Sequence, residues 1–138
     1  MAKRSIEYRR TRRLPLPWLL ELYRANAWSA ADAAETLGRA IESSDFVVSA
    51  WDADALVGLG NALSDGHLVV YYPHLLVAPS HQGRGIGRRL VGMLQERYAG
   101  FHQQVLVAEG EAIAFYEKCG FAPAGRTRSM WIYDGDDH

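Results

Sequence analysis

The sequence has one cysteine, almost no net charge and no long apolar run, and each shortage excludes a class of protein. Cys119 has no second cysteine with which to form a disulfide inside the chain, so we expect a reducing compartment. The formal net charge of −1 argues against nucleic acid or an anionic membrane as a partner. No apolar stretch reaches the ~20 residues of a membrane span. The basic start is not followed by a continuous apolar stretch, because Pro15, Pro17, Glu21 and Arg24 interrupt it, so we expect no signal peptide and a cytoplasmic protein.

The composition that remains is typical of an ordinary globular domain. Of the 138 residues, 49% are hydrophobic and 22% are charged, enough to bury a core without disulfide or metal staples. No repeat, linker or low-complexity segment divides the sequence, so we expect one domain over residues 1–138. The 5 histidines show no ligand spacing with Cys119 or with carboxylates, so no metal is expected.

Apolar periodicity and turn signals predict an α+β fold. Runs rich in β-branched and aromatic residues predict strands, and apolar residues spaced by three or four predict helices. The expected strands are 6–10, 46–51, 55–63, 67–77, 105–107 and 127–133. The expected helices are 15–25, 29–43, 85–98 and 111–118.

A glycine-rich turn past the midpoint of the chain carries the strongest functional signal. Gly83, Gly85 and Gly87 lie between an apolar strand and a helix start, where missing side chains let a ligand approach the backbone. The helix start favours an anion, and Arg84 and Arg88 add positive charge. No P-loop string occurs, and a Rossmann fingerprint would need glycine at position 88. A diphosphate cradle and a structural turn without ligand are the remaining interpretations.

Two motifs in sequence order narrow these interpretations. The string Gln82-Gly83-Arg84-Gly85-Ile86-Gly87 resembles the pyrophosphate signature of the GNAT superfamily, the acyl-CoA-dependent N-acyltransferases. The later string Ala112-Ile113-Ala114-Phe115-Tyr116-Glu117-Lys118-Cys119-Gly120-Phe121 resembles the late motif of the same family. Two motifs at the family's spacing are far more specific than either one alone.

The resemblance implies a fold, a cosubstrate and a reaction. It implies a mixed, mostly antiparallel central sheet, splayed between strands 4 and 5 and flanked by about four helices. Acetyl-CoA would lie in the splay and donate its acetyl group to a primary amine, expected to be a small molecule, and a homodimer is one expected assembly. The residues expected to bind acetyl-CoA are Leu75, Leu76, Val77, Gln82, Gly83, Arg84, Gly85, Ile86, Gly87 and Arg88.

The catalytic acid is better indicated than the base. The resemblance assigns Tyr116 as general acid, because family members place a tyrosine there that can protonate the departing sulfur. Some relatives carry a base where this chain has Pro73 and Tyr71. Tyr71 could relay a proton through water. His74 has a suitable intrinsic pKa but should point to the opposite face, unless Pro73 lies in a bulge that re-aims it. Both remain candidates.

The acceptor site is indicated only by aromatic residues. Trp28, Tyr72 and Trp131 could wall a pocket for a small amine, although aromatic residues are also common in sheet cores. A second function is an acyl-CoA-binding sensor or interaction domain without turnover. Tyr116 favours the enzyme, and the missing base at Pro73 leaves room for the sensor.

Overall fold

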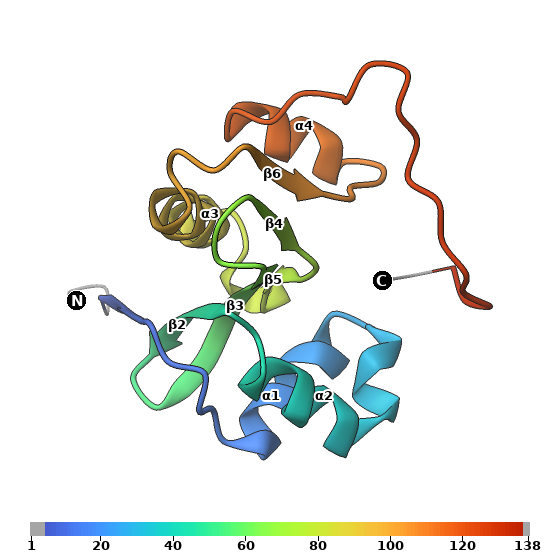
Figure 1. Cartoon of the computed structure of the whole chain (residues 1–138). Coiled ribbons are helices and arrows are strands. Elements are labelled where there is room, and N and C mark those ends of the chain that lie inside the picture. Colours follow the sequence, from blue (N-terminus) through green and yellow to red (C-terminus); the bar gives the residue numbers. More distant parts are fainter. Residues whose placement is uncertain (1–4, 137–138) are drawn as a thin grey trace.

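The structure is a computed structural model that describes residues 5–136, and one mixed sheet runs through it (Figure 1). The strands are β1 (Ile6–Arg9), β2 (Phe46–Asp52), β3 (Ala55–Ser64), β4 (Val69–Tyr72), β5 (Leu75–Val77) and β6 (Gln103–Leu106). The helices are α1 (Leu16–Ala25), α2 (Ala34–Glu42), α3 (Ile86–Arg97) and α4 (Ala112–Lys118), with 3-10 turns at Ser29–Asp32 and Pro79–His81. The strands follow the order β1-β2-β3-β4-β6, and β5 pairs with β3.

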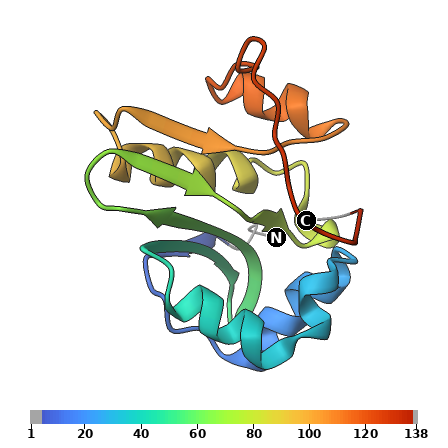
Figure 2. The same ribbon diagram turned by 45° about the vertical axis from the view of Figure 1, so that its right-hand side comes forward.

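The sheet is mostly antiparallel and carries helices on both faces. Every strand pair is antiparallel except β4 with β6, which is parallel. Helices α1 and α2 pack on one face and α3 packs on the other, as Figures 1 and 2 show from two directions. The expected α+β fold, with a mostly antiparallel mixed sheet and four helices, is confirmed.

Two apolar clusters hold these layers together, one on each face. On the α1/α2 side the buried residues include Leu19, Tyr23, Leu37, Ile41, Val47, Leu59 and Leu76. On the α3 side they include Val48, Ala50, Val57, Val70, Tyr72, Ile86, Leu90 and Leu94. The helical members recur at three- and four-residue steps, so each helix presents one apolar stripe to the sheet. Strand residues alternate between the clusters because successive side chains point to opposite faces.

The sequence predicts one strand over residues 67–77, and the structure divides it into β4 and β5. Tyr71 opposes Leu63 on β3, and Leu75 opposes Gly60. Four steps along the β4–β5 side therefore face three steps along β3, which amounts to a bulge of one residue. Pro73 lies in this bulge and has no backbone N–H to give to a ladder, so an unpaired position suits it.

The bulge reverses the pleat and is held by a side chain from β3. Tyr72 and Leu75 both belong to the cluster facing α3, although a regular strand would send them to opposite faces. The buried Asn61 completes the interrupted ladder, because its backbone N–H donates to the carbonyl of His74 (3.1 Å) and its Oδ1 accepts from the His74 N–H (3.0 Å). His74 consequently lies on the α1 side of the sheet.

The sheet opens beside β5. Strand β6 stays bonded to β4 as far as the pair Tyr72–Leu106, whereas β5 has β3 as its strand partner within residues 5–136. The edge of β5 that faces away from β3 therefore borders an opening in the sheet. The splay expected between the fourth and fifth strands of the family's sheet corresponds to this opening between β5 and β6.

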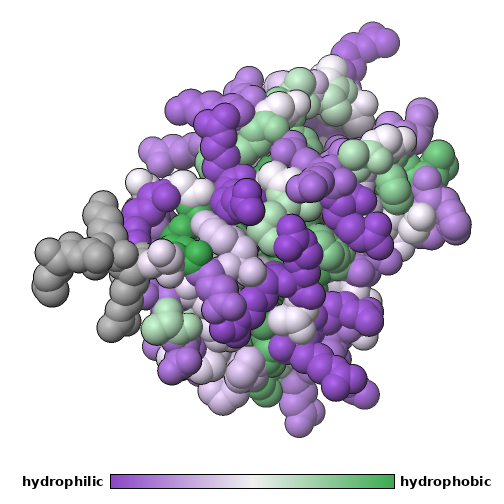
Figure 3. All heavy atoms as spheres, turned by 90° about the vertical axis from the view of Figure 1, so that its left-hand side faces the viewer, coloured by the Kyte–Doolittle hydropathy of each residue, from purple (hydrophilic) through white to green (hydrophobic). Residues whose placement is uncertain are grey.

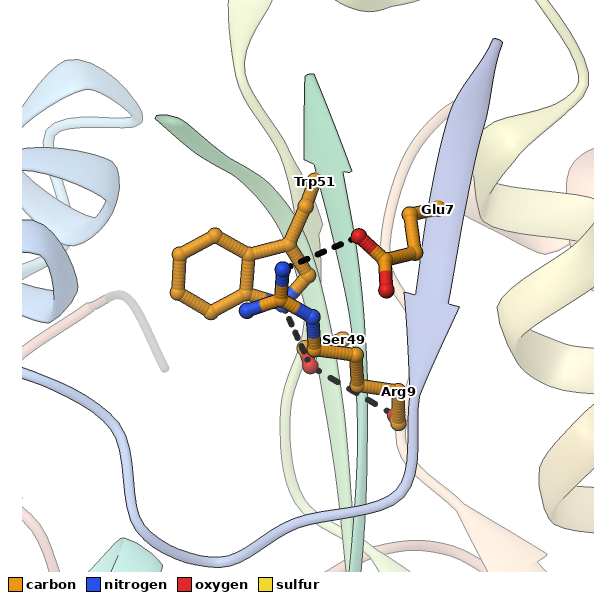
Figure 4. A network of polar contacts seen from close by, with 4 residues as sticks. All are labelled: Glu7, Arg9, Ser49 and Trp51. Atoms are coloured by element: carbon orange, nitrogen blue, oxygen red, sulfur yellow. Dashed lines mark hydrogen bonds and ion pairs between the residues drawn. The ribbon is translucent and has the colours of Figure 1, made fainter. Parts of the chain in front are cut away.

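The outermost strand β1 is joined to β2 by its backbone ladder and by a contact between Arg9 and Trp51. Figure 4 shows the guanidinium of Arg9 lying over the ring of Trp51, 4.3 Å from its centroid, and bonded to Glu7 Oε2 at 2.9 Å. The indole N–H of Trp51 donates to Ser49 Oγ at 2.9 Å. Arg9 thus packs along the edge of the sheet and does not extend into solvent as a free cation.

Two expected elements differ from the structure. A helix over residues 29–43 is wrong as a continuous element, because Ala33 has φ −110° and ψ 65°, outside helical geometry, and separates a 3-10 turn from α2. A closing strand over residues 127–133 is also wrong for this chain alone. That segment is extended and exposed, and no strand among the described residues lies beside it to pair with.

We expect the buried tyrosines to make the fold sensitive to alkali. Burial raises the pKa of Tyr23, Tyr72 and Tyr98 above the usual value. The free energy of unfolding therefore keeps its full value below about pH 10, where the unfolded chain also keeps its phenols protonated. It falls as the pH rises further. Each tyrosine should contribute a slope of up to about 1.4 kcal/mol per pH unit. Denaturant unfolding between pH 8 and 11 measures this dependence. Tyr72→Phe should make the free energy of unfolding fall less steeply with pH. A free energy that does not change between pH 8 and 11 would contradict the prediction.

Candidate functional site

A cleft of about 450 Å³ lies where the sheet opens. It is lined by residues from the end of α1, from β5, from the loop that follows β5, from the start of α3 and from α4. The lining residues are Asn26, Trp28, Leu75, Leu76, Val77, His81, Gln82, Gly83, Gly85, Ile86, Gly87, Arg88, Glu111, Ala112, Phe115 and Tyr116. Segments that are far apart in the sequence therefore meet in one cleft.

The loop before α3 presents backbone donors to this cleft. Gly83 and Gly85 have φ values of +77° and +81°, which residues with a side chain rarely adopt. Gly85 is the N-cap of α3 and makes no side-chain capping bond. The first N–H groups of a helix have no partner within the helix and carry its positive dipole end. The arrangement favours an anion at the start of α3.

Gly87, in the first turn of α3, lies close to Phe115 of α4 and Val77 of β5. A Cβ atom on Gly87 would lie 3.3 Å from Phe115 Cζ and 3.7 Å from Val77 Cγ2. A side chain there would fill the space between the loop and α4. The absence of a side chain at Gly87 keeps the anion-binding end of the cleft open.

The strand β5 offers a main-chain edge to the same cleft. Its pairs with β3 use one edge only, Gly58 with Val77 and Gly60 with Leu75. Gln82 folds back so that its Nε2 donates to the carbonyl of Val77 at 3.0 Å, which ties the loop to the end of β5. An extended ligand could lie against this edge and end at the backbone donors of the loop.

The family model described as "Acetyltransferase (GNAT) domain" matches residues 42–123. That span runs from the end of α2 past the end of α4 and contains β5, the loop and α3. The chain belongs to the GNAT acetyltransferase family. The two sequence motifs that suggested this family both contribute to one cleft of this GNAT protein.

Known proteins resemble this GNAT chain in sequence or in fold. A GNAT-family acetyltransferase from Streptococcus pneumoniae has 30% sequence identity and a TM-score of 0.83, over 95% of this chain and 100% of that one. An aminoglycoside N-acetyltransferase, solved in complex with CoA, has 20% identity and a TM-score of 0.71, with 95% of each chain covered. An uncharacterised Mycobacterium leprae protein is 36% identical over 118 residues, 81% of this chain and 32% of its own length. This chain thus spans about a third of that curated relative.

Tyr116 lies in α4 and faces the cleft. Its ring packs edge-on against Phe115 and Phe121, with ring centroids 5.1 Å and 5.9 Å apart. Burial raises the pKa of Tyr116 to about 12, so its phenol keeps its proton at neutral pH. Tyr116 is therefore a hydrogen-bond donor at the wall of the cleft.

The bulge places the ring of His74 against α1. Its Nδ1 lies 2.7 Å from the hydroxyl of Tyr23, and its ring lies edge-on to Trp28 at 5.2 Å. The phenol of Tyr23 stays protonated because burial raises its pKa, and its hydroxyl and His74 Nδ1 share one hydrogen bond. His74 adjoins the cleft through Trp28, which lines it.

Three other expected site residues do not line the cleft. Tyr72 is buried beside α3, and its hydroxyl donates to Gln104 Oε1 at 2.7 Å, so its position is that of a core residue. Tyr71 lies on β4 and is 38% exposed. Trp131 lies on the C-terminal segment with its ring against Tyr133. For the two tyrosines the reason is the bulge that follows them. Tyr72 points toward α3, and Tyr71 lies on the opposite face of the sheet.

The cleft also contains residues that sequence reasoning missed. Asn26 follows the end of α1, Glu111 is the N-cap of α4, Phe115 lies in α4, and His81 precedes the loop. Phe115 belongs to the late motif and could have been inferred from it, whereas Asn26 has no local signal. Arg84, expected to bind the diphosphate, is exposed and does not line the cleft.

His81 joins the loop to the β2–β3 hairpin. Its Nε2 lies 2.9 Å from Asp52 Oδ2, and its Nδ1 lies 2.7 Å from the hydroxyl of Ser80. Both side chains are mostly shielded from solvent. The hairpin therefore holds the residue directly before Gln82, where the loop begins.

Several groups outside these contacts have simple structural roles. Cys119 ends α4, and burial raises the pKa of its thiol, which lowers its nucleophilicity at neutral pH.

Across residues 5–136, no cluster of three His, Cys, Asp or Glu side chains is placed to hold a metal ion. The helices of that same stretch are not long and apolar enough for any to cross a membrane.

Proposed function

We propose that this chain transfers an acetyl group from acetyl-CoA to a primary amine of a small molecule, by direct attack within a ternary complex. The observation that carries the proposal is the meeting of the open β5 edge, the uncapped start of α3 and Tyr116 in one cleft. We further propose that residues 1–138 act together as one GNAT domain. The CoA complex of the similar aminoglycoside N-acetyltransferase supports the choice of donor and of acceptor class.

The residues of the cleft fit acetyl-CoA. The backbone of Leu75, Leu76 and Val77 would bond the amides of the pantetheine arm, as a neighbouring strand would. Backbone N–H groups from Gln82 to Arg88 would hold the diphosphate, with Arg88 adding charge at the cleft wall. The open positions at Gly83, Gly85 and Gly87 let phosphate oxygens reach these donors.

Tyr116 would assist departure of the sulfur. The amine nitrogen forms a bond to the carbonyl carbon, the carbon–sulfur bond breaks, and the amine loses one proton. A thiol has a pKa near 8.5, lower than that of Tyr116, so the phenol stabilises the departing thiolate mainly by donating a hydrogen bond. Tyr116 is thus the general acid or donor of this proposal. His74, with Tyr71 as the alternative through water, would accept the amine proton.

Release of free thiol from acetyl-CoA across a panel of small amines tests the function. Aminoglycosides, amino sugars and arylalkylamines, each with a measured Kd for acetyl-CoA, form the panel. Thiol release that depends on one class of amine is the expected result. Binding without thiol release on any amine would favour the alternative, an acyl-CoA-binding sensor. The chain would then lack a catalytic base, because Pro73 cannot accept a proton and His74 is hydrogen-bonded to Tyr23.

The ion pair of His81 and Asp52 gives a separate prediction. Asp52→Asn keeps the size of the side chain and removes its charge, so the loop before Gln82 is held less firmly. We expect the KM for acetyl-CoA to rise about 3- to 10-fold with kcat little changed, the effect of roughly 1 kcal/mol. Asp54→Asn, in the exposed turn of the same hairpin, is the matched control. Equal KM values for the two variants would contradict a role of Asp52 in positioning the loop.

A further inference from the structure

A second groove lies apart from the cleft, between the start of α1 and helix α2. Its volume is about 710 Å³, within the range of small-molecule sites, and none of its lining residues lines the cleft. Figures 1 and 2 both show α1 and α2 together at the bottom of the molecule, below the sheet. The groove is lined by the connection between β1 and α1, by the start of α1 and by α2.

The floor of this groove is apolar. Leu19 and Ile41 are each 1% exposed, and Leu14 and Leu16 are partly buried against the same cluster. A Cβ atom on Gly38 of α2 would lie 3.2 Å from Leu16 Cδ1, so glycine lets α2 approach the start of α1. On the face drawn in Figure 3, apolar side chains reach the surface only in small groups between hydrophilic ones. The floor of the groove offers a ligand more apolar contact than such a surface does.

The two sides of the groove carry opposite charge. Arg12 and Arg13 lie on the connection before α1, which gives that side a formal charge of +2. Glu35 and Glu42 flank Arg39 on α2, which gives the other side a formal charge of −1. All five side chains are exposed, and within residues 5–136 no ion pair joins any of them to another side chain. Their charges are therefore not neutralised by a neighbour.

We propose that this groove binds a small zwitterion with an apolar body, an α-amino acid with an aliphatic side chain. Its carboxylate would lie on the connection side, its ammonium group on the α2 side and its aliphatic part on the floor. A simple anion would meet two carboxylates, and a simple cation would meet three guanidinium groups. A ligand with both charges is complementary to both sides. The inference does not depend on acetyl transfer, because the cleft contributes no residue to it.

Hydrogen bonds connect the groove to the bulge beside the cleft. Arg12 Nη1 donates to the carbonyl of Ser44 at 3.2 Å, and Ser44 Oγ accepts from Asn61 Nδ2 at 3.1 Å. The Oδ1 of Asn61 accepts from the backbone N–H of His74. Ser44 and Asn61 are 0% and 3% exposed, so this part of the connection is buried. Because bonded groups polarise one another, a carboxylate bound to Arg12 should change the surroundings of the Asn61 amide.

Nuclear magnetic resonance titration of the full chain tests this inference with three matched probes. Leucine carries both charges, 4-methylpentanoate lacks the ammonium group, and 3-methylbutylamine lacks the carboxylate. We expect leucine to bind with a Kd on the order of 1 mM, and the other two probes at least about fivefold more weakly. Amide signals of residues 12–19 and 35–42 should shift with leucine, together with the side-chain amide of Asn61.

Variants that remove one charge locate the site. Arg13→Gln and Glu42→Gln should each weaken leucine binding at least about fivefold, since each removes one partner of the zwitterion. Arg10→Gln on the same connection and Glu21→Gln on α1 are the matched controls, because both residues are exposed and neither lines the groove. Both controls should keep the Kd of the unchanged chain. Far-ultraviolet circular dichroism confirms that all four variants are folded.

Other results overturn the proposal. Equal affinity for leucine and 4-methylpentanoate would indicate an anion site. Shifts confined to the indole N–H of Trp28 and the rest of the cleft would mean that leucine binds as an acceptor amine. Binding that survives both Arg13→Gln and Glu42→Gln would lie elsewhere, and no saturable shift with any probe would mean that the groove takes no such ligand. An Asn61 signal that stays in place would overturn the connection to the bulge.

Discussion

Replacement of Gly87 by valine is expected to weaken acetyl-CoA binding about 10- to 100-fold while leaving the protein folded, an effect of roughly 1.4 to 3 kcal/mol. The first carbon of any side chain there would lie 3.3 Å from Phe115 and 3.7 Å from Val77. Valine adds two methyl groups beyond that carbon. They would occupy the space between the loop and α4 into which the diphosphate must enter.

Calorimetric titration with acetyl-CoA measures this effect directly. Gly92→Ala is the matched control, since Gly92 lies in the same helix and an added Cβ meets no atom within 4 Å. That control should keep the Kd and raise the free energy of unfolding by about 0.5 to 1 kcal/mol, because alanine is the better helix former. A Gly87→Val protein that binds acetyl-CoA as tightly as Gly92→Ala would refute the cradle.

Replacement of Tyr116 by phenylalanine is expected to lower kcat at least about tenfold with an unchanged Kd for acetyl-CoA. The ring contacts with Phe115 and Phe121 remain, so the geometry of α4 should persist. Only the proton that stabilises the departing sulfur is lost. Single-turnover measurements with the best amine of the panel separate this chemical step from product release.

The pH profile supplies the second half of this test. With its pKa raised to about 12, Tyr116 stays protonated across the working range, so it causes no loss of kcat up to about pH 10. The rise of kcat with pH should then follow deprotonation of the acceptor amine in both proteins. Tyr8→Phe, the same change outside the cleft, serves as the control. An unchanged kcat in Tyr116→Phe would remove this residue from the mechanism.

The parts of the site predicted from sequence are those whose constraints are local. Gly83 and Gly85 need positive φ values within one turn, and Tyr116 lies in a short helix with its own motif. The structure brings Gly83, Gly85 and Tyr116 into one cleft. Their proposed roles await the experiments above.

The parts that were missed depend on contacts between distant segments. The bulge at Pro73 arises from pairing with β3 and from the side chain of Asn61, which no pattern within 67–77 reveals. For the same reason Tyr72 was expected in the cleft and lies in the core. Residues 127–133 have a strand pattern, but a strand also needs a neighbour, and no described strand lies beside this segment.

In the proposed complex acetyl-CoA is held mostly by main-chain groups, and this has a consequence for how the protein can change. Because backbone N–H and C=O groups at β5 and the loop do not depend on residue identity, substitutions at Leu75 or Val77 can accumulate without loss of the donor. Under the same proposal, selectivity for the acceptor would arise where side chains line the cleft, at Asn26, Trp28 and Glu111. One can therefore change the amine that this scaffold accepts by altering two short segments, and keep its acyl donor.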